Sequence, residues 1–223
     1  MSPPTAIVLP SLNYQDSLDR VLGEIPRDRG YRIYVVDDGS TVPLKVPTGV
    51  RVLRHAHNKG YGAAQKTGYA AALANGADRV VMLHGDGQYP TEATLALADA
   101  LDDADCALGS RFLSHGGAHI PSWRRWGNRL LTGAANLRFG QHMSELHTGA
   151  RAFRAEALVR LPLESFSDDY VFDQQVLVGL MARGLRIAER PLEARYDDTV
   201  QSITLRRSVR YGLGCLWTIA RGR

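Results

Sequence analysis

The stretch V-V-M-L-H-G-D-G-Q-Y-P at residues 80–90 decides the fold class of this chain. Its apolar run stops at His84, and glycines then alternate with Asp86 and Gln88. This pattern is typical of a buried parallel strand that ends at a sheet edge, where ligands bind in α/β proteins. I-Y-V-V-D-D-G-S at 33–40 repeats it. Two buried strands that end in acidic residues predict a site for a nucleotide and a divalent cation.

Composition supports a globular protein that handles anionic ligands. Of the 223 residues, 44% are hydrophobic and 22% are charged, which is enough for a sizeable core. The formal net charge of +4 fits anionic ligands or an anionic membrane surface. The basic residues are scattered and are not interleaved with aromatic residues, which argues against a nucleic-acid partner.

The sequence also predicts where the protein acts. Cys106 and Cys215 lie far apart and do not form a disulfide framework, so a reducing cytoplasm is expected. No signal peptide is visible, and no apolar run reaches the roughly 18 residues that a membrane span needs.

Strand and helix patterns alternate along the first half. The expected strands are 6–9, 31–36, 50–53, 79–83 and 106–108, and the expected helices are 16–25, 60–74 and 91–101. This order predicts an α/β fold with a Rossmann-like, doubly wound, mostly parallel sheet. No repeat or linker divides the chain, so residues 1–223 are expected to form a single domain.

The second half is less regular. The polar connection 111–125 is expected to be a lid or binding loop, the alternative being a plain surface loop. The remaining expected elements are helices at 126–139, 154–161 and 170–183 and strands at 148–153 and 185–191. Residues 202–223 are expected to form a basic amphipathic helix.

Several short motifs together resemble those of a known family. They are V-V-D-D-G-S at 35–40, N-K-G-Y-G at 58–62, H-G-D-G-Q-Y-P at 84–90, G-S-R at 109–111 and H-T-G-A-R-A-F at 147–153. In this order they resemble family 2 glycosyltransferases of the GT-A fold, in the dolichol-phosphate mannosyltransferase-like branch. S-D-D-Y-V-F-D-Q-Q at 167–175 and R-R-S-V-R-Y-G-L-G at 206–214 resemble a bacterial subgroup of that branch.

The resemblance spans about residues 5–215 and implies an activity. The expected reaction is an inverting, metal-dependent transfer of a sugar from a nucleotide-diphosphate sugar. The donor half, which would bind the nucleotide sugar, would span about residues 5–110. The acceptor half would span about residues 111–200.

The resemblance also implies roles for single residues on the donor side. The base and ribose of a UDP- or GDP-linked sugar would contact Pro10, Asn13, Asp38, Lys59 and Gly60. Asp86 matches the second acid of the family's D-x-D motif, which holds Mg²⁺ or Mn²⁺ on the diphosphate, and Gln88 lies beside it. Arg111 matches a basic residue near the sugar diphosphate. Hard cations prefer oxygen ligands, and a metal with an arginine stabilises the departing diphosphate.

His84 departs from the family pattern, because it replaces the first acid of D-x-D. A histidine can ligate Mn²⁺ or hydrogen-bond a phosphate, but it adds no negative charge. The alternative is a buried structural histidine. P-S-L-N-Y at 10–14 also lacks the acid that often follows the family's asparagine, which leaves the nucleotide preference open.

On the acceptor side, Asp168 and Asp169 precede a predicted helix, and Asp173 is expected on the same helix face as Asp169. The acids at 168 and 169 cap the helix, or one of them is the general base for a hydroxyl acceptor. A phosphate acceptor needs no strong base. Four arginines would bind it unless they only form a solvated surface: Arg124, Arg125, Arg129 and Arg151.

The acceptor itself stays open between a polyprenyl phosphate and a small-molecule hydroxyl or phosphate. The helix expected at 202–223 would contact the inner face of a membrane peripherally, or dock on the core or on a second subunit of a homodimer.

Two other functions remain as alternatives. One is a catalytically weak homologue that binds a nucleotide sugar, which His84 favours. The other is a sugar-1-phosphate nucleotidyltransferase. That enzyme class would show a G-x-G-x-R-T type loop after the first strand, where this chain has P-S-L-N-Y-Q at 10–15.

Overall fold

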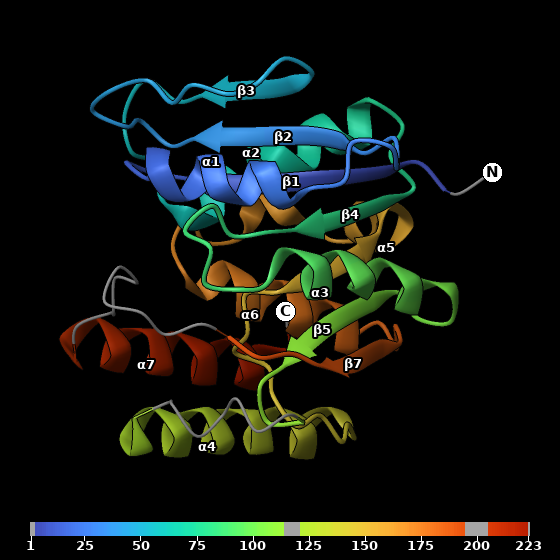
Figure 1. Cartoon of the computed structure of the whole chain (residues 1–223). Coiled ribbons are helices and arrows are strands. Elements are labelled where there is room, and N and C mark those ends of the chain that lie inside the picture. The colour runs from blue at the N-terminus through green and yellow to red at the C-terminus, as the bar shows by residue number, and fades with distance from the viewer. Residues whose placement is uncertain (1–2, 114–120, 195–204, 223) are drawn as a thin grey trace.

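A seven-stranded sheet with helices on both faces forms the protein, seen here in a computed structural model that describes residues 3–113, 121–194 and 205–222 (Figure 1). The strand order is β3-β2-β1-β4-β6-β5-β7. The strands are β1 Thr5–Ser11, β2 Arg32–Asp37, β3 Val50–Arg54, β4 Arg79–Met82, β5 Cys106–Ser110, β6 Arg151–Arg154 and β7 Ile187–Pro191.

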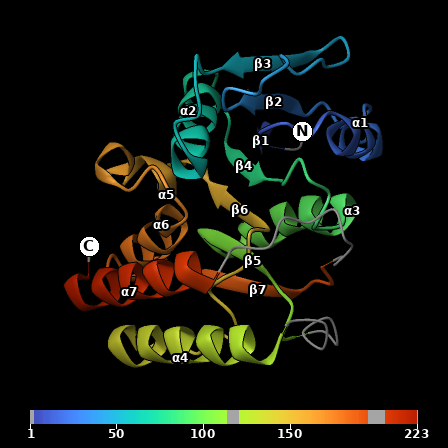
Figure 2. The ribbon, with the colours of Figure 1, turned by 90° about the vertical axis from the view of Figure 1, so that its left-hand side faces the viewer.

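The helices occupy the connections between these strands. They are α1 Gln15–Glu24, α2 Tyr61–Ala74, α3 Thr91–Leu95, α4 Ser122–Phe139, α5 Ala155–Val159, α6 Val171–Met181 and α7 Leu205–Arg221, with the short 3₁₀ helices η1 Ala96–Asp102 and η3 Leu163–Ser165. Figure 2 shows α1 and α3 on one face of the sheet and α2, α5 and α6 on the other. The doubly wound α/β architecture that the sequence predicted is therefore confirmed.

Strand direction brings the important loops to one edge of the sheet. All pairs are parallel except those of β6, which runs antiparallel to both β4 and β5. The carboxyl ends of β1, β2, β4 and β5 therefore meet the amino end of β6 at the same edge. Figure 2 looks towards this edge.

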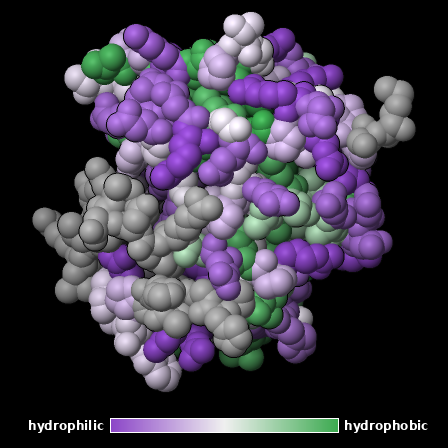
Figure 3. All heavy atoms as spheres, in the orientation of Figure 1, coloured by the Kyte–Doolittle hydropathy of each residue, from purple (hydrophilic) through white to green (hydrophobic). Residues whose placement is uncertain are grey.

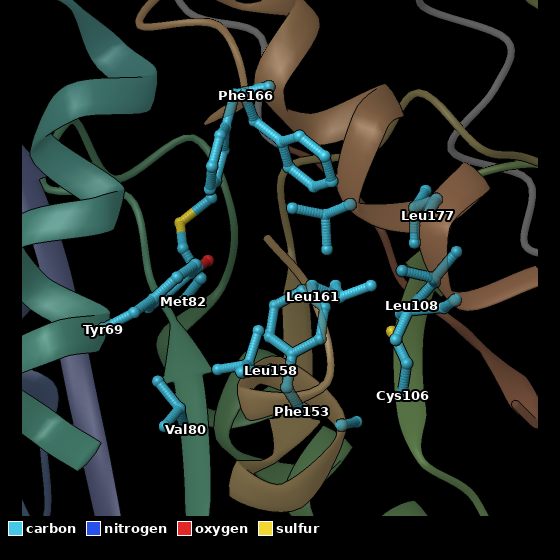
Figure 4. Packing of buried hydrophobic residues seen from close by; sticks show 14 of the residues in the cluster. Tyr69, Val80, Met82, Cys106, Leu108, Phe153, Leu158, Leu161, Phe166 and Leu177 are labelled. Atoms are coloured by element: carbon cyan, nitrogen blue, oxygen red, sulfur yellow. The ribbon is translucent and has the colours of Figure 1, made fainter. Parts of the chain in front are cut away.

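Each face of the sheet buries its own apolar cluster, because successive strand residues point to opposite faces. In β1, Val8 joins the cluster under α2 and α6, whereas Ile7 joins the cluster under α1 and α3. Figure 4 shows the first cluster, in which Tyr69 of α2 and Phe153 of β6 meet edge to face. Outside this core, hydrophilic residues cover most of the described surface on the face seen in Figure 3.

The sequence misplaced two helices. The helix expected at 91–101 is α3 followed by the 3₁₀ helix η1. Helix α4 starts at Ser122, directly after Pro121, whereas the sequence analysis assigned 111–125 to a loop. Pro121 is the N-cap of α4, where the missing N–H of proline costs no helical hydrogen bond. Arg124 and Arg125 are thus helical, and residues 114–120 of the expected lid lie outside the described residues.

Helix α7 docks on the folded domain. It lies beside α4 and α6 (Figures 1 and 2) and buries Cys215, Thr218 and Ile219. Within the described ranges, no helix combines the length and apolarity needed to cross a bilayer.

Helix α2 packs on the sheet at a distance that only glycine allows at position 68. A Cβ added to Gly68 would lie 2.2 Å from Cγ1 of Val8, whereas a Cβ added to Gly133 of α4 would meet nothing within 4 Å. We therefore expect Gly68→Ala to lower the free energy of unfolding by about 1–3 kcal/mol through overpacking. Gly133→Ala should raise it by about 0.5–1 kcal/mol through chain entropy. Urea titration of both variants measures the contrast, and equal effects would contradict it.

Candidate functional site

The loops after β1 and β2 are joined to each other at the sheet edge. The backbone N–H of Asn13 donates to Oγ of Ser40 at 2.9 Å, and Oδ1 of Asn13 accepts from the N–H of Thr41 at 2.9 Å. Asn13 adopts a left-handed φ of 59° to make both contacts. Pro10 is the next-to-last residue of β1. The structure thus joins Asn13 to the D-D-G-S loop, while Pro10 pairs with Val36 of β2.

Asp37, the first acid of that loop, is structural. Its carboxylate accepts the N–H groups of Ser40 at 2.8 Å and Leu44 at 3.2 Å, and it pairs with Arg54. Burial alone would raise the pKa of Asp37, but these hydrogen bonds outweigh it and lower the pKa below the usual value. Asp37 is therefore ionised and holds the turn closed.

Asp38, the second acid, fixes the next loop. Its Oδ1 lies 2.6 Å from Nδ1 of His55 and accepts from the N–H of Lys59, while Oδ2 accepts from the N–H of Gly60, both at 2.9 Å. Asp38 is buried beneath these residues, and the Lys59 side chain is exposed. Because a carboxylate oxygen accepts two hydrogen bonds, Oδ2 retains a second acceptor direction.

His84 is locked between aromatic rings at the end of β4. Its ring centroid lies 5.7 Å from that of Tyr61 and 5.3 Å from that of Tyr89. Nε2 lies 3.2 Å from the Tyr61 hydroxyl, and a Cβ on Gly149 would fall 2.1 Å from it. Since Nε2 is enclosed by this packing, a ligand would have to reach His84 through Nδ1.

Asp86 lies on the same loop and is partly exposed. Its Oδ1 accepts the N–H of Gln88 at 2.9 Å. The pKa of Tyr14 is raised, first by burial and then by the nearby charges of Asp86 and Tyr170. Asp86 therefore lies near Tyr14, which precedes α1.

A buried carboxylate, Asp173 of α6, links this edge to the opposite half of the molecule. It accepts from Nε2 of Gln65 at 2.8 Å and from the Tyr61 hydroxyl at 3.3 Å, and it pairs with Nη1 of Arg151 at 3.2 Å. The sequence placed Arg151 in ligand binding. The structure instead places it 1% exposed beneath the site, where its Nε donates to the Thr148 carbonyl. A buried carboxylate needs a buried partner, and Arg151 supplies it.

Arg111, expected near the diphosphate, also faces a protein carboxylate. Its guanidinium pairs with Glu145, and Nη2 donates to the His147 carbonyl at 2.9 Å. Glu145 also accepts from the Asn128 side chain at 2.8 Å. Arg111 lies at the expected sheet edge, but this ion pair holds it in a buried position.

The segment with Asp168 and Asp169 closes the start of α2. The Asp168 carbonyl accepts the N–H groups of Gly62 at 2.8 Å and Ala63 at 3.2 Å, and its carboxylate pairs with Lys66 at 2.6 Å. Asp169 accepts the N–H of Tyr170 through Oδ1. Both aspartates are exposed before α6 begins at Val171. Neither side chain caps α6, the helix that follows them, and it is the backbone carbonyl of Asp168 that caps α2.

The arginines of α4 lie apart from the donor loops. Arg124, Arg125 and Arg129 belong to the helix that packs beside α7, at the opposite end of the molecule from β3 (Figure 1). The Arg129 guanidinium lies 5.6 Å from the Phe112 ring centroid. Helix α4 thus carries these three arginines at the end of the sheet where β5 and β7 lie (Figure 1).

Sequence reasoning missed a row of tyrosines that joins the two halves. Tyr61 stacks on Tyr170 at 5.2 Å between centroids and on His84 from the other side. Tyr14 approaches Tyr170 as well. The signal was present, because a tyrosine follows P-S-L-N, N-K-G and S-D-D in the sequence.

A metal ion at this edge would depend on few protein ligands. Within the described ranges, no group of three or more histidine, cysteine or acidic side chains could hold one. Asp86 offers carboxylate oxygens that suit Mg²⁺ or Mn²⁺, and such ions keep waters and phosphate oxygens as further ligands. The donor set thus fits an ion that is bound together with a diphosphate.

His147, in the loop before β6, is partly buried and uncharged. Nδ1 lies 2.8 Å from the Tyr211 hydroxyl of α7, and Nε2 is buried with no hydrogen-bond partner among the described residues. Burial, followed by the positive charges of Arg151 and Arg111, lowers its pKa from 6.5 to about 3.

This shift predicts a loss of stability in acid. Below the ordinary pKa of 6.5 the unfolded chain binds a proton that folded His147 does not, so folding weakens as the pH falls towards about 3. We expect His147→Gln to lose less unfolding free energy than the unchanged chain between about pH 7.5 and about pH 5. Urea titrations at both pH values test this. The matched change at exposed His142 should leave the pH dependence unaltered.

Comparison with known proteins places this geometry in a family. The chain is 29% identical to the polyprenol monophosphomannose synthase of Mycolicibacterium smegmatis, over 84% of this chain and 76% of that protein. It is 26% identical to the undecaprenyl-phosphate mannosyltransferase of Micrococcus luteus, over 97% of each.

Solved structures agree on the fold. The glucosyl-3-phosphoglycerate synthase of Mycobacterium tuberculosis, determined in complex with UDP, superimposes with a TM-score of 0.75 at 20% identity. The match covers 99% of this chain and 80% of that one. The model of the family described as Glycosyl transferase family 2 matches residues 6–161. With this match over more than half of its length, the chain belongs to glycosyl transferase family 2.

Proposed function

We propose that this glycosyltransferase transfers a hexose from a UDP- or GDP-linked sugar to a polyprenyl phosphate, with inversion at the anomeric carbon. The observation that carries the proposal is Asp86, a partly exposed carboxylate at the end of β4, beside loops that Asp37 and Asp38 hold in place. The curated relatives named for polyprenyl-phosphate and undecaprenyl-phosphate mannosylation support the acceptor class.

The donor half would be built from loops that are already ordered by their own hydrogen bonds. Asn13 and the Lys59–Gly60 backbone would border the base and ribose, with the free acceptor direction of Asp38 turned to the base. Exposed Lys59 suits the diphosphate, because a lysine is a strong point charge for phosphate. Loops fixed before binding reduce the ordering cost of the nucleotide.

Asp86 would hold Mg²⁺ or Mn²⁺, with Gln88 beside it and His84 available only through Nδ1. When bound, the ion would neutralise charge on the departing nucleoside diphosphate. A structural relative, the mycobacterial glucosyl-3-phosphoglycerate synthase, has been determined with Mn²⁺ and UDP, which supports this cofactor class.

A single displacement fits the carboxylates at this edge. Retention through a covalent intermediate needs a carboxylate that is free to attack. The buried acids Asp37, Asp38 and Asp173 are each held by hydrogen bonds from the chain. Of the more exposed acids, Asp168 is paired with Lys66, Asp169 accepts from the Tyr170 N–H, and Asp86 would hold the metal ion. An acceptor phosphate oxygen would instead attack the anomeric carbon directly, as the bond to the diphosphate breaks. An ionised phosphate needs no general base, so Asp168 and Asp169 would act in positioning.

The proposal is tested by turnover with short-chain polyprenyl phosphates. UDP- and GDP-hexoses are supplied with Mn²⁺, with Mg²⁺ or with a chelator, and the anomeric configuration of the product is read by NMR. Product of inverted configuration that forms only with metal is expected. Donor binding without transfer to any acceptor would favour the alternative of a catalytically weak homologue.

Asp86→Asn provides the sharpest site variant. The amide oxygen still accepts from the Gln88 N–H, but the negative charge is lost. We expect the metal-dependent rise in melting temperature with nucleotide to disappear, and transfer to fall by about a hundredfold or more. Asp16→Asn, on the exposed start of α1, is the control. Unchanged metal-dependent binding in Asp86→Asn would rule Asp86 out as the ligand.

His84→Asp tests the departure from the family's acid pair. A second carboxylate beside Asp86 should lower the Mn²⁺ concentration for half-maximal transfer by about tenfold, since ligand charge tunes cation affinity. His84→Asn removes the ring equally but adds no charge, so it should not lower that concentration. If both variants lose binding alike, His84 serves through its packing against Tyr61 and Tyr89.

A further inference from the structure

Helix α4 turns an apolar stripe to solvent. The stripe consists of Trp123, Trp126, Leu130 and Leu137, and Trp126 and Leu130 are each 69% exposed. Their spacing of three, four and seven residues places them on one helix face. The opposite face buries Asn128, Leu131, Thr132 and Ala135.

Helix α7 repeats this arrangement. Its exposed stripe consists of Val209, Leu213, Leu216 and Trp217, and Trp217 is 54% exposed. The inward face carries Cys215, Thr218 and Ile219. The two helices lie side by side, with α4 at the outer limit of the molecule (Figures 1 and 2).

The residue types on these stripes are specific. All three tryptophans of the chain lie there. Tryptophan is enriched where an apolar phase meets water, because its ring is apolar and its N–H is polar. Large exposed leucines on an adjacent turn add buried area once such a helix lies in an interface.

Charge is segregated onto the same two helices. Helices α4 and α7 each contain four arginines and no acidic residue. The whole chain has a formal net charge of +4. With +8 on these two helices, the remainder of the chain carries −4. The net positive charge of this protein is therefore carried by α4 and α7.

We propose that α4 and α7 form a docking surface for an anionic lipid bilayer. Each basic side chain near such a surface is attracted by about 1 kcal/mol, and tryptophan and leucine insert at the boundary. A second copy of the chain fits less well. A symmetric contact through these helices would bring together surfaces with eight arginines each and no acidic residue to offset them.

The docking surface is coupled to the candidate site through α7. Tyr211 hydrogen-bonds His147 in the loop before β6, and a Cβ on Gly214 would lie 2.8 Å from Cγ2 of Val171, where α6 begins. Docking would therefore hold the acceptor side of the sheet edge near the lipid headgroups. This inference rests on the proposed function only in its choice of a lipid-borne phosphate as acceptor.

The test is co-sedimentation of the full chain with vesicles. Vesicles of phosphatidylcholine with about a third phosphatidylglycerol should bind it, and pure phosphatidylcholine should not, because the attraction is electrostatic. High salt should weaken the binding. Absence of binding to the anionic vesicles would overturn the proposal.

Two double variants separate the contributions of charge and insertion. Arg138→Glu with Arg210→Glu, and Trp126→Ser with Trp217→Ser, change exposed residues and should each lower the partition coefficient more than tenfold. Val159→Ser with Arg160→Glu, at the exposed C-terminal end of α5, is the matched control and should bind as the unchanged chain does. Equal losses in all three would contradict the assigned surface.

Two further measurements distinguish the competing explanations. Sedimentation equilibrium without lipid should show a monomer; a dimer that the tryptophan variant dissociates would assign the surface to a second copy. The nucleotide- and metal-dependent melting shift, measured without vesicles, should be the same in all variants. If the unchanged chain shows no such melting shift but still binds vesicles, the proposed function is wrong and the docking surface stands.

Discussion

The buried ion pair between Arg151 and Asp173 is the constraint around which the two halves assemble. Arg151 stands on β6 at 1% exposure, and Asp173 stands on α6. A buried charge without its partner costs several kcal/mol, so α6 is stable only where its carboxylate reaches the arginine. Gln65 and Tyr61 of α2 donate to the same carboxylate. Asp173 therefore fixes the relative positions of three elements. They are β6 and α6 of the acceptor half and α2, which follows the donor loops.

The same network explains how a histidine fits at a position where the family has an acid. Tyr61 lies between His84 and Asp173 and is hydrogen-bonded to both. A carboxylate at position 84 would place a second negative charge on the other side of that hydroxyl. The imidazole adds no charge, and it fills the space that Gly149 leaves open between two tyrosine rings. The departure at His84 is thus matched by its surroundings, whether or not Nδ1 contacts an ion.

Local pattern was enough to predict most strands and the acids at their ends, because apolar runs and the turns after them are encoded within a few residues. It was not enough for Arg151, since a basic residue in a glycine-rich motif resembles a ligand contact. Its burial depends on a carboxylate 22 residues later in the chain. The stacking of Tyr61 on Tyr170 joins residues from α2 and the start of α6, so no sequence window contains both. Contacts between the halves are tertiary, and periodicity does not report them.

The net charge of a sequence likewise does not report where the charges lie on the folded surface. A formal net charge of +4 describes a mildly basic protein. It does not show that α4 and α7 carry eight arginines and no acid, while the rest of the chain is net acidic. Only the fold places α4 beside α7, because the sequence separates them by more than sixty residues. Charges on one surface act together over about a Debye length, whereas scattered charges are screened from each other. The spatial distribution of charge, which the fold creates, therefore decides how this protein is oriented towards an anionic surface.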